Sequence, residues 1–129
     1  MKTVFEAVYS RFTGSELDAA IEGRLYPMQA PVGTSAPLVI STITSETSTY
    51  GFTSSFITAL VELSVYATDP VAMNAIADKV FSLYDDCKLS GLVGYDQVGP
   101  MSRDFATPLI VENVYRYIIE YRLNLQKQG

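Results

Sequence analysis

The clearest pattern of hydrophobic and polar positions lies in residues 56–84. Apolar and polar residues alternate with a period of two over residues 56–67, which predicts a β-strand with one covered face. Asp69 and Pro70 then mark a helix start, because Asp69 can accept a hydrogen bond from a free backbone N–H and Pro70 suits the first helical position. Apolar residues recur at three- and four-residue spacing over residues 71–84, which predicts an amphipathic helix. We expect the covered face of the strand to carry Ile57, Ala59, Val61, Leu63, Val65 and Ala67.

The N-terminal third of the chain has the pattern of two short helices. The spacing of apolar residues predicts a first helix over residues 3–12. Ser15 and Asp18 resemble a capping box that opens a second helix over residues 16–22, which Gly23 ends. A short edge strand near Leu25 and Tyr26 is expected next, followed by an irregular, proline-rich connection up to residue 37.

The remaining apolar segments predict further strands. Residues 38–44 are mostly β-branched, residues 92–98 form a short candidate strand, and residues 109–125 alternate as one long last strand with a frayed tail at 126–129. The order of elements predicts an α+β fold, with a mostly antiparallel sheet and helices packed on one face. The length of 129 residues predicts a single domain, residues 1–129.

The second face of the predicted sheet also carries apolar residues. The central strand places Phe56, Leu60 and Tyr66 there, and the last strand adds Ile118 among charged residues. This face is either a subunit contact or an ordinary exposed face with scattered apolar residues, and both interpretations stay open. For the contact, we expect Arg116, Glu120 and Arg122 to form inter-subunit ion pairs.

Two turn-rich links are candidates for contacting a partner. The Ser/Thr-rich link over residues 45–51 is either an exposed hairpin loop or an arm that docks on a neighbouring chain through Tyr50 and Phe52. The link over residues 99–108 contains Arg103 and Phe105. We expect residues 45–52 and residues 99–108 to contact partner proteins.

Composition narrows the possible chemistry. The net charge of −5 argues against a basic surface that would hold nucleic acid. The chain has no histidine and a single cysteine, Cys87, so the commonest general base and metal ligand are missing and Cys87 is expected to be a packing residue. No nucleophile elbow or phosphate-binding loop appears, and no apolar run reaches the ~20 residues of a membrane span. We therefore expect a non-enzymatic protein without cofactor, metal or membrane segment.

Three features together resemble the tail completion or tail terminator proteins of long-tailed bacteriophages. They are the run Gly23-Arg24-Leu25-Tyr26-Pro27 leading to Pro37-Leu38-Val39-Ile40, the long strand followed by the helix over 71–84, and a long closing strand of alternating Arg and Tyr. The resemblance implies a virion protein, assembled in the host cytoplasm, that forms a ring, commonly hexameric, on the tail tube. Its partners would be the tail tube protein and the head connector, and DNA would pass through its lumen without specific binding.

The resemblance has one physical consequence for the lumen of the ring, and one alternative function stays open. An acidic lumen wall would repel phosphate, so we expect acidic residues to line the pore. The alternative is a small oligomeric α+β domain with a ligand-binding or regulatory role. That alternative requires a concave pocket with a few convergent polar groups.

Overall fold

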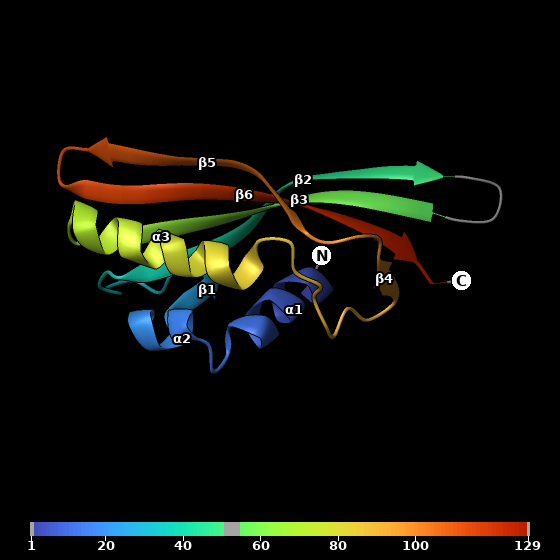
Figure 1. The fold of residues 1–129 in the computed structure, drawn as a ribbon, viewed down its shortest axis with the longest axis horizontal. Coiled ribbons are helices and arrows are strands. Elements are labelled where there is room, and N and C mark those ends of the chain that lie inside the picture. The colour runs from blue at the N-terminus through green and yellow to red at the C-terminus, as the bar shows by residue number, and fades with distance from the viewer. Residues whose placement is uncertain (1, 51–54, 129) are drawn as a thin grey trace.

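A six-stranded sheet extends along the molecule, and the helices lie against one of its faces (Figure 1). This computed structural model describes residues 2–50 and 55–128. The strand order is β1-β2-β3-β6-β4, and β5 also pairs with β6. Among the strands of the described residues only the β1–β2 pair is parallel, so the predicted α+β class with a mostly antiparallel sheet is confirmed. The helices are α1 (Lys2–Phe12), α2 (Glu16–Ile21) and α3 (Pro70–Tyr84); the strands are β1 (Leu25–Pro27), β2 (Leu38–Tyr50), β3 (Ser55–Ala67), β4 (Tyr95–Gln97), β5 (Ser102–Val111) and β6 (Val114–Lys127).

The helix caps follow from local sequence. Asp69 is the N-cap of α3, and its Oδ1 accepts a hydrogen bond from the Ala72 N–H at 2.8 Å. Ser15 caps α2 in the same way, since its Oγ accepts from the Asp18 N–H at 3.2 Å. In each case a side-chain oxygen satisfies a backbone donor that the first turn of a helix leaves free.

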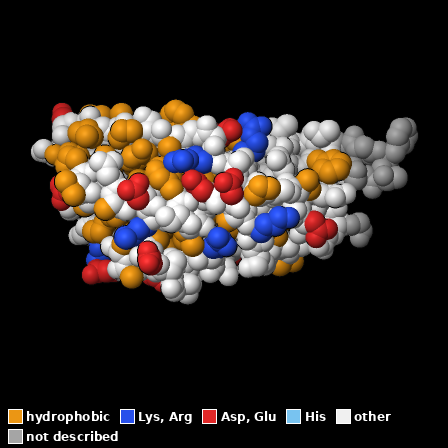
Figure 2. Space-filling model, viewed as in Figure 1, with side chains coloured by type: hydrophobic (Ala, Val, Ile, Leu, Met, Phe, Trp, Pro, Cys, Tyr) orange, Lys and Arg blue, Asp and Glu red, His pale blue; other side chains and the backbone are white. Residues whose placement is uncertain are grey.

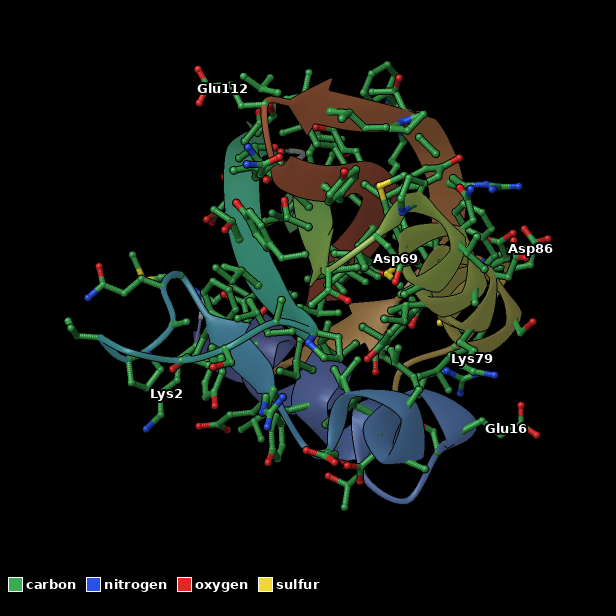
Figure 3. All side chains as sticks on the ribbon, turned by 90° about the vertical axis from the view of Figure 1, so that its left-hand side faces the viewer. Lys2, Glu16, Asp69, Lys79, Asp86 and Glu112 are labelled. Atoms are coloured by element: carbon green, nitrogen blue, oxygen red, sulfur yellow. The ribbon has the colours of Figure 1, made fainter. Side chains whose placement is uncertain are left out.

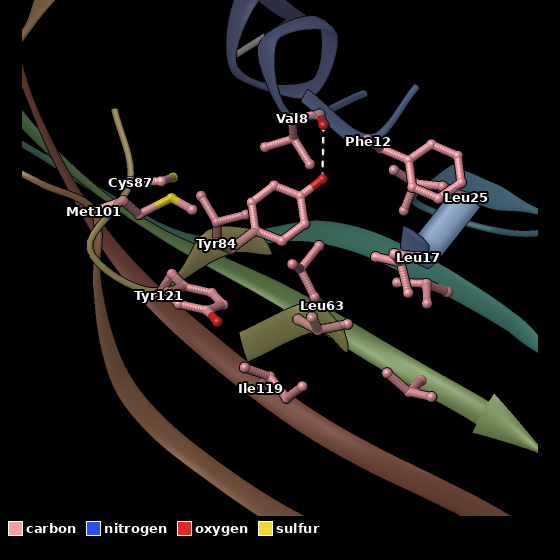
Figure 4. Packing of buried hydrophobic residues seen from close by; sticks show 14 of the residues in the cluster. Val8, Phe12, Leu17, Leu25, Leu63, Tyr84, Cys87, Met101, Ile119 and Tyr121 are labelled. Atoms are coloured by element: carbon pink, nitrogen blue, oxygen red, sulfur yellow. Dashed lines mark hydrogen bonds between the residues drawn. The ribbon is translucent and has the colours of Figure 1, made fainter. Parts of the chain in front are cut away.

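The core lies between the sheet and the three helices (Figure 4). The predicted apolar face of β3 is buried, and it packs beside the inward row of β6 and the inner faces of α1 and α3. Tyr84 at the end of α3 is fully buried, and its hydroxyl donates a hydrogen bond to the Val8 carbonyl of α1 at 2.7 Å. This bond joins two helices that are far apart in the sequence. The buried row of β6 is Ile119, Tyr121, Leu123 and Leu125.

The prediction of a turn-rich link over residues 45–51 is wrong for residues 45–50, because these residues continue strand β2. They pair with β3 from Ser45 opposite Leu60 to Tyr50 opposite Ser55, after an irregularity in the register at Thr44. Threonine is β-branched and suits a pleated strand, and the ladder to β3 supplies the backbone hydrogen bonds. Phe52 lies outside the described residues.

The single long strand predicted over residues 109–125 is also wrong, because a tight turn divides it. β5 ends at Val111 and β6 begins at Val114, with Glu112 in the left-handed region at φ 54°. The turn contains no glycine, and Asn113 alone is a weak turn signal inside an apolar run. Most of the predicted link over residues 99–108 therefore belongs to β5. Pro108 is tolerated because β5 pairs with β6 on one side only among the described residues.

Two further strand boundaries differ between the prediction and the structure. The tail predicted to fray from residue 126 is ordered through Lys127, because β4 pairs with the end of β6 and places Tyr95 opposite Lys127. The strand predicted over residues 92–98 shrinks to the three residues of β4.

Candidate interaction surfaces

The sheet face without helices, here called the open face, carries the second row of β3 and β6 side chains (Figure 1). Phe56 is 42% exposed there, and Leu60, Tyr66 and Ile118 are partly exposed. The face mixes apolar and charged side chains, as the sequence predicted. Its charged side chains on β3 and β6 are Glu62, Arg116, Glu120 and Arg122.

Arg116 is the best-connected charged residue of the open face. Its Nη2 lies 3.4 Å from Glu62 Oε2 and donates to Ser64 Oγ at 3.0 Å, and Ser64 Oγ donates to the same Glu62 oxygen at 3.0 Å. The guanidinium also lies 5.4 Å from the centre of the Tyr66 ring. The Arg116 Nε is buried and finds no acceptor among the described residues. Arg116 is therefore held in a network within its own chain.

The other two residues predicted in ion pairs also contact their own chain. Arg122 Nη2 lies 3.0 Å from Asp104 Oδ2, and this carboxylate raises the pKa of the guanidinium. Thr44 Oγ1 donates to Glu120 Oε2 at 3.3 Å. Inter-subunit pairing of Arg116, Glu120 and Arg122 stays a prediction, and such pairing would have to add to or replace these contacts.

We expect Glu62→Gln to lower the free energy of unfolding by about 1–2 kcal/mol, because the half-buried Arg116 would lose its charged partner. Asp104→Asn is the matched control, since its pair with Arg122 is more exposed and should contribute less than about 1 kcal/mol. Urea unfolding followed by circular dichroism measures both. Equal losses in the two variants would contradict the importance of the Glu62 network.

Arg103 and Phe105 lie on opposite faces of the sheet. Arg103 stands opposite Tyr121 on the helix side, and Phe105 stands opposite Glu120 on the open face, because a register shift between them adds one residue. The Arg103 guanidinium lies 4.0 Å from the centre of the Phe81 ring, and its Nη2 is 3.4 Å from Asp85 Oδ2. Through these two contacts, Arg103 connects β5 to the C-terminal end of α3. Phe105 is 52% exposed and remains available for a partner.

Asp85 also binds a buried tyrosine. The Tyr121 hydroxyl donates to Asp85 Oδ1 at 2.6 Å, and burial together with this hydrogen bond raises the pKa of Tyr121. The Asp85 carboxylate thus joins the end of α3 to β5 and β6.

An exposed apolar hairpin tip is the feature that sequence reasoning missed. Residues 109–114, here called the β5–β6 tip, expose Leu109, Ile110, Val111 and Val114 by 43–55%. Figure 2 shows hydrophobic side chains gathered at the end of the molecule that carries this turn. The available signal was a run of apolar residues around Glu112-Asn113.

An apolar groove lies between α1 and β1. This groove, here called the α1–β1 groove, has a volume of about 300 Å³. Among the described residues that line it, only Glu6 is charged and the lining surface is almost entirely apolar, so the groove lacks the convergent polar groups expected of a small-molecule site. Its lining consists of Phe5, Glu6, Tyr9, Ser10, Leu25, Pro27 and Ser41.

The described residues offer no metal centre or membrane helix. No group of three or more Cys, Asp or Glu side chains within residues 2–50 and 55–128 is placed to hold a metal ion. None of the helices in that part of the chain is long and apolar enough to cross a membrane.

The fold and surfaces define an α+β chain with helices on one face of a mixed sheet and an open second face. No family model and no curated protein matches the sequence. Among solved structures, a chain of the virion of a native gene transfer agent particle has a similar fold, with a TM-score of 0.77 and 19% sequence identity. The match covers 97% of this chain and 96% of that chain. The likeness therefore extends over the whole fold.

Proposed function

We propose that this chain is a structural virion protein that forms a ring at the head-proximal end of a phage tail tube. In this role it stops tube polymerisation and joins the tail to the head connector. The observation that carries the proposal is the whole-length fold similarity to a chain of a gene transfer agent virion. The sequence resemblance to tail terminator proteins supports the more specific role.

The surfaces fit a ring. A ring of identical chains needs two different patches on each subunit, because each contact is head-to-tail. The chain offers an open sheet face, an apolar hairpin tip and an apolar groove. We assign these surfaces to contacts with neighbouring copies, the tail tube and the head connector.

The charge of the chain fits passage of DNA. A net charge of −5 disfavours retention of phosphate, and acidic side chains along the lumen would repel it. The ring needs no catalytic group, cofactor or metal to act in this way. The proposed location is the virion, after assembly in the host cytoplasm.

Light scattering over a concentration series, with negative-stain images of the same sample, tests the ring. We expect a hexamer mass with ring-shaped particles, or a monomer that assembles into rings when tail tube is added. A stable monomer or dimer that ignores tail tubes would contradict the proposal. Stabilisation of that species by a small molecule would favour the alternative of a ligand-binding or regulatory domain.

A further inference from the structure

We propose that the outer side of strand β2 over residues 45–49, here called the β2 edge, pairs with the same edge of a second copy of this chain. The two edges form an antiparallel ladder that joins both sheets into one continuous sheet. The proposal goes beyond the tail role and does not rest on it, because it follows from backbone hydrogen bonding that the fold of the described residues leaves open.

Strand β2 extends well beyond its outer neighbour. β1 pairs with β2 only over residues 39–41, whereas β2 continues along β3 to Tyr50. Figure 3 shows the short β1 beside the lower part of β2. At the end of β1, Met28 turns the chain away at φ 68°, and a groove of about 360 Å³ lies beside residues 42–46. Within the described residues, no strand pairs with the outer side of residues 42–50.

The hydrogen bonds to β1 show which backbone groups of β2 point outward. The Val39 N–H donates to the Arg24 carbonyl at 2.9 Å, and the Ser41 carbonyl accepts from the Met28 N–H at 2.7 Å. In a strand, alternate residues direct both of their backbone groups to the same side. The odd-numbered residues of β2 therefore face outward before the register shift at Thr44.

The register shift changes the outward set to the even-numbered residues, because it adds one residue to β2. Glu46 and Ser48 then direct their N–H and C=O groups away from β3. These groups have no backbone partner within residues 2–50 and 55–128. Only another extended backbone supplies donors and acceptors at the spacing of this row.

The edge strands β1 and β5, in contrast, each carry a proline that faces outward. β1 bonds to β2 through its even-numbered residues, so Pro27 faces away from β2. The two-residue turn makes Val111 and Val114 a hydrogen-bonded pair, so by alternation Pro108 faces away from β6. A proline there removes an outward donor and discourages edge pairing. Residues 45–49 contain no proline, so the β2 edge lacks this protection.

The β2 edge is accessible to a second chain. Residues 44–49 are exposed, and because successive side chains alternate between the two faces, both faces are open there. Figure 1 shows this end of β2 extending past the helices. A neighbouring strand can therefore lie alongside it without meeting a helix.

A second copy fits because two antiparallel edges are self-complementary about a twofold axis. An axis at Thr47 places Glu46 of each copy opposite Ser48 of the other, and each such pair exchanges both of its N–H···O bonds. The Ser48 hydroxyl is then a donor beside each Glu46 carboxylate. An axis at Glu46 would instead set two carboxylates opposite each other, which is unfavourable. The ladder is therefore centred on Thr47.

Disulfide trapping tests this register. Thr47 of the two copies face each other as a non-hydrogen-bonded pair with Cα atoms about 4.5 Å apart, which is within the reach of a disulfide. We expect Thr47→Cys to give a linked dimer on mild oxidation, seen on a non-reducing gel. Thr49→Cys is the matched control on the same face of β2, because its two copies would be about 13 Å apart along the strands. The native Cys87 is buried, so the wild type should not cross-link.

A proline at the β2 edge tests the pairing without a cross-link. Ser48→Pro removes an outward N–H and leaves the ladder to β3 intact. We expect the dissociation constant of the dimer to rise at least about tenfold, because the donor is lost in both copies. Ser48→Thr keeps the N–H and the hydroxyl and should dimerise like the wild type. Light scattering over a concentration series measures association, and circular dichroism verifies that each variant is folded.

Three results would overturn the pairing. They are Thr47→Cys cross-linking no faster than Thr49→Cys, association of Ser48→Pro equal to that of the wild type, and a wild-type monomer throughout the concentration series. If that monomer bound tail tubes and Ser48→Pro did not, the edge would receive a strand of the tube protein instead of a second copy.

The outcomes separate this inference from the proposed function. A twofold contact closes at two copies and builds no ring by itself, so Ser48→Pro should still form rings on tail tube. Rings without cross-linking at Thr47→Cys reject only the edge pairing. An edge-paired dimer that never forms rings rejects only the tail role.

Discussion

Replacing Tyr84 by alanine is expected to lower the free energy of unfolding by about 3–5 kcal/mol. Tyr84 is fully buried, its ring lies 6.2 Å from the Tyr121 ring, and its hydroxyl donates to the Val8 carbonyl at 2.7 Å. The substitution would leave a cavity between α1, α3 and the sheet. Since domains are commonly stable by only about 5–15 kcal/mol, this variant should be marginally folded.

The variants Tyr84→Phe and Tyr26→Ala separate the contribution of the Tyr84 hydrogen bond from that of its ring packing. Tyr84→Phe keeps the ring and removes only the hydrogen bond to Val8, so we expect a loss of about 1 kcal/mol. Tyr26→Ala removes a half-buried ring from the short strand β1 and should cost clearly less than Tyr84→Ala. Urea unfolding followed by circular dichroism gives all three values. A Tyr84→Ala loss no larger than that of Tyr26→Ala would contradict the packing described for the core.

Stability is expected to fall steeply above a pH of about 10, the ordinary pKa of tyrosine. Burial raises the pKa of Tyr84, and burial with the Asp85 hydrogen bond raises the pKa of Tyr121. Burial also raises the pKa of Cys87, which begins the same trend at lower pH. All three groups are thus held in their protonated form in the folded protein.

The sign of the effect follows from proton binding. Above pH 10 the tyrosines of the unfolded chain lose their protons while Tyr84 and Tyr121 keep theirs in the folded chain. The unfolded state then binds fewer protons, so the stability that is fully present below pH 10 declines as pH rises. The slope approaches about 1.4 kcal/mol per pH unit for each tyrosine.

Urea unfolding at closely spaced alkaline pH values tests this dependence. Tyr121→Phe and Tyr84→Phe should each remove a large part of the slope above pH 10, and the double variant should remove most of it. The slope below that pH should not change. Variants with the wild-type slope would show that neither hydroxyl is held protonated by folding.

The strand and helix over residues 56–84 could be predicted because their signals are local. Period-two alternation marked the buried face of β3, and Asp69 and Pro70 marked the start of α3. The second half of β2 could not be predicted, because Ser45 and its polar neighbours owe their strand conformation to pairing with β3. Tertiary pairing decided the conformation where local propensity was ambiguous.

The candidate surfaces could be predicted less well from the sequence than the secondary structure could. The turn at Glu112 lacks glycine, so the apolar tip was hidden inside a long strand. The orientation of Arg103 towards Phe81 depends on a register shift that no local pattern predicts. Contact of Arg103 with a partner stays a prediction. The groove joins α1, β1 and β2, whose approach only the folded chain defines.

Growth of tail tubes in the presence of this protein tests the proposed role most directly. Tail tube protein would be polymerised with and without the purified chain, and tube length and tube ends would be measured in electron micrographs. We expect shorter tubes that carry a ring at one end and no longer elongate when fresh tube protein is added. Tubes of unchanged length with bare ends would contradict a terminator role.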